Sequence, residues 1–122
     1  MKQPSPSSIE RVAKMTVASV YPMYLSRIEK HGRTQAELNQ VIEWLTGYDE
    51  DQLNRMLEDK TSFGDFYDNC TLNPNAEQIT GVVCGYRIED IENEFMRKCR
   101  YLDKMVDELA RGRKMDKILR SE

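Results

Sequence analysis

The residue best suited to covalent chemistry is Cys84, because a glycine stands close to it on each side, at Gly81 and Gly85. The glycines could leave the thiol exposed. Arg87 could then lower its pKa, and His31 could act as the base that makes it a nucleophile. A cysteine that follows two valines is also typical of a small, buried, structural side chain. A reactive thiol needs an accessible and electropositive setting, so we favour the structural interpretation and assign no catalytic residue.

The segment around this cysteine, 72–87, is where we expect a small molecule to bind if the protein takes one. It has the composition of a long loop, and loops of this length inside a compact domain often carry function. The polar side chains there that could contact a ligand are Asn73, Asn75, Thr80, Cys84 and Arg87. Asparagine and proline also favour loops for conformational reasons alone, so a scaffold role is the alternative.

Metal and acid–base chemistry find little support in this sequence. His31 is the single histidine, and it stands just before Gly32, where a cation favours the end of a helix. No histidine and cysteine have the spacing of metal ligands. The carboxylates at 65–68 and 89–92 are neighbours in sequence, which favours a solvated helix face over two groups that converge across a cleft. We expect no metal and no cofactor, and the sequence favours a non-enzymatic protein over an enzyme.

Three capping boxes mark where the helices that position these side chains begin. In each box a serine, threonine or aspartate stands three residues before a glutamate or glutamine. The pairs are Ser7 with Glu10, Thr34 with Glu37 and Asp49 with Gln52. A fourth, short aromatic helix is expected after a cap at Thr61 or Ser62.

The spacing of the apolar residues predicts how far each helix continues beyond its start. We expect a weak element at 8–17, helical or extended, and helices at 19–31, 35–46, 50–60 and 93–111. Pro22 fits the first turn of the helix at 19–31, where a missing N–H costs nothing. The stretch 79–88 holds a possible short strand or a turn. We favour a turn followed by a helix, because a lone strand has no obvious partner.

The helix at 93–111 carries an apolar seam whose spacing alternates between four and three residues. Its members are Phe95, Cys99, Leu102, Val106 and Leu109. Such a seam is typical of a helix that packs against other helices, in its own chain or in a second copy. We therefore treat these five as candidate interface residues and expect self-association as a homodimer.

The chain as a whole has 122 residues, of which 39% are hydrophobic and 32% charged, enough for one domain with its own core. We expect that domain at 9–120, after a disordered polar tail at 1–8. No apolar run approaches the roughly 18 residues that cross a bilayer. The polar start also lacks the features of a signal peptide. We expect no membrane partner and a cytoplasmic location.

Nucleic-acid binding is the weakest of the candidate functions. The net charge is −3, whereas a protein that neutralises phosphates needs a basic face. The helices expected at 35–46 and 50–60 superficially suggest a helix-turn-helix. The second would open with Asp49, Glu50 and Asp51, which phosphates repel.

Several separated motifs resemble one bacterial family of unknown function, the domain-of-unknown-function family 2200. The motifs are ASVYP at 18–22, GRT at 32–34, WLTGY at 44–48, LNP at 72–74, ITGVVCG at 79–85 and YLDK at 101–104. The resemblance spans roughly 11–120. It implies a small bacterial cytoplasmic protein and supplies no activity, cofactor or catalytic residue.

Together these patterns predict an all-α or nearly all-α single domain of five or six helices. The function that we rank first is a non-enzymatic protein-interaction module, as a homodimer. The alternative is a small-molecule-binding protein or minor enzyme that uses the 72–87 loop, and a DNA-binding accessory protein ranks third.

Overall fold

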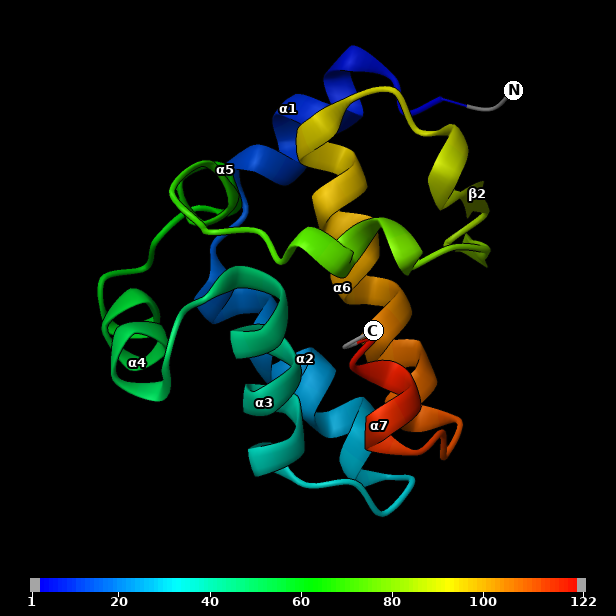
Figure 1. Cartoon of the computed structure of the whole chain (residues 1–122). Coiled ribbons are helices and arrows are strands. Elements are labelled where there is room, and N and C mark those ends of the chain that lie inside the picture. Colours follow the sequence, from blue (N-terminus) through cyan, green and yellow to red (C-terminus); the bar gives the residue numbers. More distant parts are fainter. Residues whose placement is uncertain (1–2, 121–122) are drawn as a thin grey trace.

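The computed structural model describes residues 3–120, and nearly all of its regular structure is helical (Figure 1). The α-helices are α1 (Pro6–Lys14), α2 (Val17–Glu29), α3 (Gln35–Thr46), α4 (Glu50–Glu58), α5 (Phe63–Asp68), α6 (Glu94–Ala110) and α7 (Met115–Ile118). Two 3₁₀ helices, η1 (Pro74–Gln78) and η2 (Ile88–Asp90), flank a hairpin of strands β1 (Val82–Val83) and β2 (Tyr86–Arg87). The predicted single, nearly all-α domain is confirmed, with seven helices among the described residues. None of these described helices is long and apolar enough to cross a membrane.

Two of the three predicted capping boxes are present, at the starts of α3 and α4. The Thr34 side chain accepts a hydrogen bond from the backbone N–H of Glu37, and the Glu37 carboxylate accepts one from the N–H of Thr34. Asp49 and Gln52 do the same for α4. These boxes satisfy backbone donors that the first helical turn cannot satisfy itself. The third box, at Ser7, is wrong.

The N-terminus is ordered further back than the expected boundary at residue 9. Ser5 caps α1, because Pro6 occupies the first helical position, where its missing N–H costs nothing. Gln3 donates to the carbonyl oxygen of Asp90 at 2.5 Å and accepts from the N–H of Glu92 at 2.9 Å. The disordered tail expected at 1–8 is therefore contradicted for residues 3–8, while residues 1–2 lie outside the described part of the chain.

The start of α2 also differs from the prediction. Thr16 caps this helix, so it begins two residues before Ser19 and Pro22 falls in its second turn. Backbone contacts explain the earlier start: the N–H of Val17 donates to the Thr61 carbonyl at 2.9 Å. A sequence pattern cannot reveal this contact, because the two residues lie on different elements.

The long helix α6 lies at the centre of the fold, with α2 and α3 on one side and α5, β1 and α7 also in contact with it (Figure 1). The seam residues Cys99, Leu102, Val106 and Leu109 are at most 5% exposed, and Phe95 packs against the same core. These candidate interface residues form the core of the domain itself. The seam is buried by its own chain, as its spacing requires, except that Phe95 is only partly buried.

Strands β1 and β2 pair with each other, which corrects the preference for a turn followed by a helix at 79–88. Val82 pairs with Arg87 and Val83 with Tyr86. The two residues between them, Cys84 and Gly85, both have positive φ, at 52° and 82°. Two positive φ angles in a two-residue loop define the type I′ turn, whose twist matches that of the paired strands. The strand at 82–83 therefore pairs with the residues that follow the turn directly.

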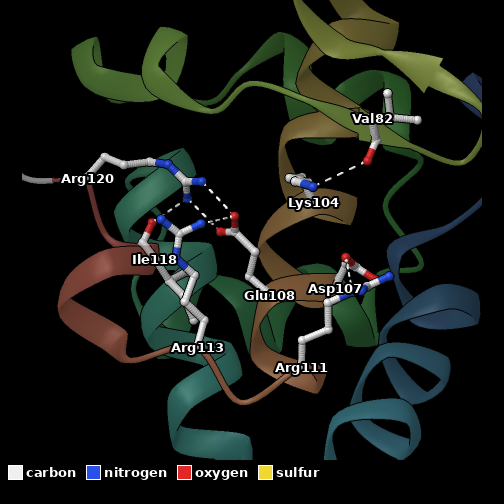
Figure 2. Close-up of polar contacts among 8 residues, drawn as sticks. All are labelled: Val82, Lys104, Asp107, Glu108, Arg111, Arg113, Ile118 and Arg120. Carbon is white, nitrogen blue, oxygen red and sulfur yellow. Dashed lines mark hydrogen bonds and ion pairs between the residues drawn. The ribbon is translucent and has the colours of Figure 1, made fainter.

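The C-terminal helix α7 is held to α6 by a buried carboxylate. Glu108 is 5% exposed and accepts hydrogen bonds from Arg113 at 2.5 Å and from Arg120 at 2.7 and 2.8 Å, as Figure 2 shows. Arg33 adds a bond of 2.7 Å to the carbonyl oxygen of Arg113. Two of the basic residues after α6, Arg113 and Arg120, therefore act as intramolecular partners of Glu108.

Candidate functional site

The five ligand-binding candidates of the 72–87 segment do not form one site. Asn73 has a structural role: its side-chain oxygen caps η1 by accepting from the N–H of Asn75, and its amide donates to the Trp44 carbonyl at 3.1 Å. Thr80 and Arg87 are exposed. The asparagines of this segment thus explain its conformation rather than a binding function.

Cys84 lies at the tip of the hairpin, beside a carboxylate of α6. Its Sγ is 3.9 Å from Oδ2 of Asp103. Partial burial of the sulfur and the negative charge of Asp103 raise the pKa of the thiol, and the cations that oppose this shift are Arg100 and Arg27. The charged groups that affect this thiol are therefore Asp103, Arg100 and Arg27, and not Arg87 and His31 as the sequence suggested. A thiol with a raised pKa is a weak nucleophile at neutral pH. The buried position that the structural interpretation expected is wrong, because Cys84 is exposed at the turn.

A cavity of about 200 Å³ opens beside the polar groups that Cys84 contacts. It lies between α1, α2, α5 and α6, and its walls are mostly apolar. The lining residues are Val12, Met15, Val20, Met23, Tyr24, Phe63, Tyr67, Cys99, Arg100 and Asp103. Of the residues singled out from the sequence as candidates, this cavity contains Cys99 alone.

The polar end of the cavity is built around Asp103. The Tyr24 hydroxyl donates to Oδ1 of Asp103 at 2.5 Å, and Nη1 of Arg100 donates to Oδ2 at 2.7 Å. Burial, followed by the charge of Asp103 and the hydrogen bond to it, raises the pKa of Tyr24 well above its ordinary value. Tyr24 therefore remains a neutral donor, and the carboxylate and the guanidinium balance each other's charge.

Two further polar groups near this end lack partners. Tyr67 is 1% exposed, and its hydroxyl forms no hydrogen bond with any described residue. Nε of Arg100 is also buried without a partner in the same part of the chain, although its guanidinium carbon lies 5.4 Å from the centroid of the Tyr86 ring. A buried polar group without a partner requires an explanation, because most such groups in folded proteins are bonded.

The backbone around the cavity is held by contacts between distant turns. Thr16 and Ser62 form an isolated antiparallel bridge, and the N–H of Phe63 donates to the Met15 carbonyl at 2.7 Å. A Cβ at Gly64 would lie 3.3 Å from the carbonyl oxygen of Ala13, so α5 approaches α1 closely at this glycine. Met15 and Phe63, which one of these hydrogen bonds joins, both line the cavity.

The entrance itself is lined by methionines. Met23 is 67% exposed and Met15 is 39% exposed, and both also line the cavity. Methionine side chains are flexible and polarizable, so they adapt to ligands of different shape.

Few features of the amino-acid sequence indicate this site. Arg100 and Asp103 stand at i, i+3 spacing on one helix, which is a recognisable ion pair beside an apolar seam. Their partner Tyr24, however, lies 79 positions away from Asp103 along the chain. Tyr67 was expected as part of an aromatic helix, and only its burial without a hydrogen-bond partner distinguishes it.

The site has the chemistry of a binding pocket rather than of a metal centre. Among residues 3–120 no three His, Cys, Asp or Glu side chains converge as metal ligands would. The cavity instead combines apolar walls with a few convergent polar groups, which is typical of sites for small organic molecules.

Comparison with known proteins gives a family and a solved structure. Residues 11–120 match the family described as an uncharacterized protein conserved in bacteria (DUF2200). The fold is similar to the crystal structure of uncharacterized protein SP1917, with 34% identity, a TM-score of 0.86, and coverage of 91% of this chain and 92% of that chain. No curated protein matches the chain. The chain therefore belongs to the DUF2200 family of bacterial proteins.

Proposed function

We propose that the protein binds a small, mostly apolar organic molecule in the cavity between α1, α2, α5 and α6. The observation that carries this proposal is a cavity of about 200 Å³ with apolar walls and a polar end built from Tyr24, Arg100 and Asp103. A site of this kind supports the alternative function, small-molecule binding. It lies between helices, however, and not in the 72–87 loop where the sequence suggested it.

The size of the cavity limits the ligand. An apolar cavity of roughly 150 Å³ is large enough to take up benzene, whereas sites for drug-sized ligands span roughly 300–1,000 Å³. A single aromatic ring with a short substituent, or an acyl chain of similar volume, matches the space. For so small a ligand we expect a Kd on the order of 10⁻⁴ M.

Nuclear magnetic resonance of the methionine methyl groups tests the proposal. Cumene and acetophenone are two substituted benzenes with the same number of non-hydrogen atoms. We expect the Met15 and Met23 methyl signals to shift in a saturable manner as each compound is added. Shifts that never saturate, or that spread over all seven methionines alike, would overturn the proposal.

A variant that fills the cavity provides the control. Val20 lines the cavity, so Val20→Phe places an aromatic ring inside it and is expected to abolish binding while the fold is retained. The same substitution at Val41, which is 0% exposed and absent from the cavity lining, should lower the free energy of unfolding by about 1–3 kcal/mol through overpacking. Equal destabilisation by both variants would contradict the presence of usable space at Val20.

The homodimer stays a prediction, and it needs a different interface from the buried α6 seam. The large hydrophobic side chains that are exposed among the described residues are Met15, Met23 and Val82. Sedimentation at micromolar concentration tests the prediction, and a monomer would contradict it. DNA binding keeps its low rank, because Glu50 and Asp51 are exposed in the first turn of α4.

A further inference from the structure

The hydroxyl of Tyr67 is the feature of the cavity that packing does not explain. Its ring stacks on Phe63 with centroids 5.9 Å apart and meets Phe66 and Phe95 edge-on at 4.9 and 6.0 Å. A phenylalanine would make the same aromatic contacts. The hydroxyl adds a buried polar atom that forms no hydrogen bond with the described residues.

Other tyrosines of this protein show how a hydroxyl is normally accommodated. Tyr48 donates to the carbonyl oxygen of Phe66 at 2.7 Å, and Tyr24 donates to Asp103. Tyr21 donates to the side-chain oxygen of Asn39 at 2.5 Å. Tyr67 is more deeply buried than Tyr48 and Tyr21 and still lacks such a bond within the described chain.

The residue that carries this unused hydrogen-bonding capacity is one of those that line the cavity. Tyr67 lines the cavity, and its hydroxyl lies within electrostatic reach of Cys99, Tyr24 and Asp103, which line it too. Burial, followed by these neighbours, raises the pKa of Tyr67 well above its ordinary value, so the group stays protonated and can donate.

The carboxylate of Asp103 at this end of the cavity is already hydrogen-bonded at both oxygens. One oxygen of Asp103 accepts from Tyr24, and the other accepts from Arg100 and contacts the thiol of Cys84. The groups without a partner are the hydroxyl of Tyr67, which can donate or accept a hydrogen bond, and the N–H at Nε of Arg100, which can only donate. A ligand complementary to this site therefore supplies an acceptor.

The charge of the site determines which acceptor fits. Asp103 and Arg100 neutralise each other, and both tyrosines are neutral. A ligand carboxylate would lose its hydration in an apolar cavity and would face the carboxylate of Asp103 without a free counter-charge. A neutral oxygen, such as that of a ketone, aldehyde or alcohol, loses far less hydration free energy on entering the cavity.

We propose that the cavity is selective for small aromatic or acyl compounds that carry one neutral oxygen, and that Tyr67 is the residue that recognises this oxygen by donating a hydrogen bond to it. This inference rests on the proposed function, because it assigns the ligand class of the same cavity.

Binding of acetophenone, cumene and benzoate to the wild type and to Tyr67→Phe tests the inference. Cumene has a methyl group in place of the carbonyl oxygen of acetophenone, and benzoate has a charged carboxylate in place of the acetyl group. Removal of the hydroxyl should weaken acetophenone binding about tenfold, the value of one typical hydrogen bond, and leave cumene binding unchanged or slightly tighter. Benzoate should bind to neither protein.

Tyr48→Phe is the matched control, because it removes the same atom from a tyrosine whose hydroxyl already bonds to the protein. It should leave the affinities for acetophenone and cumene unchanged. If Tyr67→Phe alters the two affinities by the same factor, or if benzoate binds as well as acetophenone, the assigned ligand class is wrong while the cavity remains a binding site. If neither neutral compound binds to the wild type, the proposed function fails as well.

Discussion

At the scale of single residues, Tyr67 and Tyr48 offer a direct comparison of two buried hydroxyls. The hydroxyl of Tyr48 has a backbone partner, whereas that of Tyr67 has none among the described residues. Desolvation of a polar group costs free energy that only a hydrogen bond recovers. In the ligand-free protein the two hydroxyls should therefore contribute to stability with opposite signs.

The prediction is that Tyr67→Phe leaves the free energy of unfolding unchanged or raises it by about 1 kcal/mol, while Tyr48→Phe lowers it by about 1 kcal/mol. Urea denaturation followed by circular dichroism measures both values. A loss of stability in Tyr67→Phe as large as that in Tyr48→Phe would show that the hydroxyl of Tyr67 has a strong partner in the free protein.

The thiol of Cys84 gives a second residue-scale prediction. Its pKa is raised from 9.0 by burial and then by the charge of Asp103, so little thiolate is present at pH 8. Asp103→Asn removes one of these causes, and the rate of alkylation of Cys84 by iodoacetamide at pH 8 should increase. Mass spectrometry of the Cys84 peptide follows the reaction.

Asp65→Asn, a change of an exposed carboxyl on α5, is the control for this experiment and should leave the rate unchanged. An Asp103→Asn variant that reacts no faster than the wild type would show that the carboxylate does not suppress the thiol.

At the scale of elements, the helix caps connect local sequence to stability and to pH. Glu37 closes the capping box of α3 and also bonds with Arg33 at 3.0 Å. Burial opposes ionisation of this carboxyl, but the N–H of Thr34 and the charge of Arg33 prevail and lower its pKa from 4.5. The ionised form is thus favoured in the folded state over the unfolded state.

This shift predicts how stability depends on acid. A group whose pKa is lowered on folding contributes stability that is present above its unfolded pKa, here 4.5, and is lost as the pH falls through the folded value. Glu37→Gln keeps the capping oxygen but loses the charge. We expect it to be less stable than the wild type at pH 7, by up to about 1 kcal/mol, and equal to it in strong acid.

Thermal unfolding between pH 7 and pH 2.5 measures this difference. Glu43→Gln, on the exposed side of α3, should follow the wild type throughout. A stability difference for Glu37→Gln that is constant with pH would rule out the ionised carboxylate as its source.

At the scale of the whole molecule, adjacent acidic residues on α6 hold two distant parts of the chain. Asp107 pairs with Arg27 and Arg111, whose side chains are 50% and 77% exposed. Glu108 pairs with Arg113 and with Arg120, which is only 12% exposed, and these bonds fasten α7 to α6 (Figure 2). If Asp107 is removed, water can hydrate the exposed side chains of Arg27 and Arg111. Water has little access to the side chain of Arg120 if Glu108 is removed.

The two carboxylates should therefore differ in their effect on stability. Glu108→Gln leaves Arg120 buried without a counter-charge and should lower the free energy of unfolding by about 3 kcal/mol. Asp107→Asn, the neighbouring control, should cost less than about 1 kcal/mol, as exposed ion pairs do. Urea denaturation measures both values. In limited digestion with trypsin, the first cuts in the Glu108→Gln variant should follow the basic residues within 111–120. Equal costs would contradict a special role for the buried pair.

The parts of the fold that local chemistry controls could be predicted from the sequence. The boxes at Thr34 and Asp49 define the starts of α3 and α4, because a cap needs only residues within one turn. The spacing of the α6 seam correctly indicated a buried helix face. The same spacing could not say whether this chain or a second copy covers that face, since both bury the same apolar area.

Tertiary structure alone decided the rest, because the decisive contacts join residues far apart in sequence. The sequence by itself determined a small helical domain with its caps and its central helix. Only folding brought Tyr24 to Asp103 and placed the hydroxyl of Tyr67 beside the cavity. Nearer the C-terminal end of α6, folding placed the guanidinium of Arg120 against the carboxylate of Glu108. Cys84, the first candidate for chemistry, is a thiol whose pKa is raised by partial burial and then by the charge of Asp103, a residue of another element.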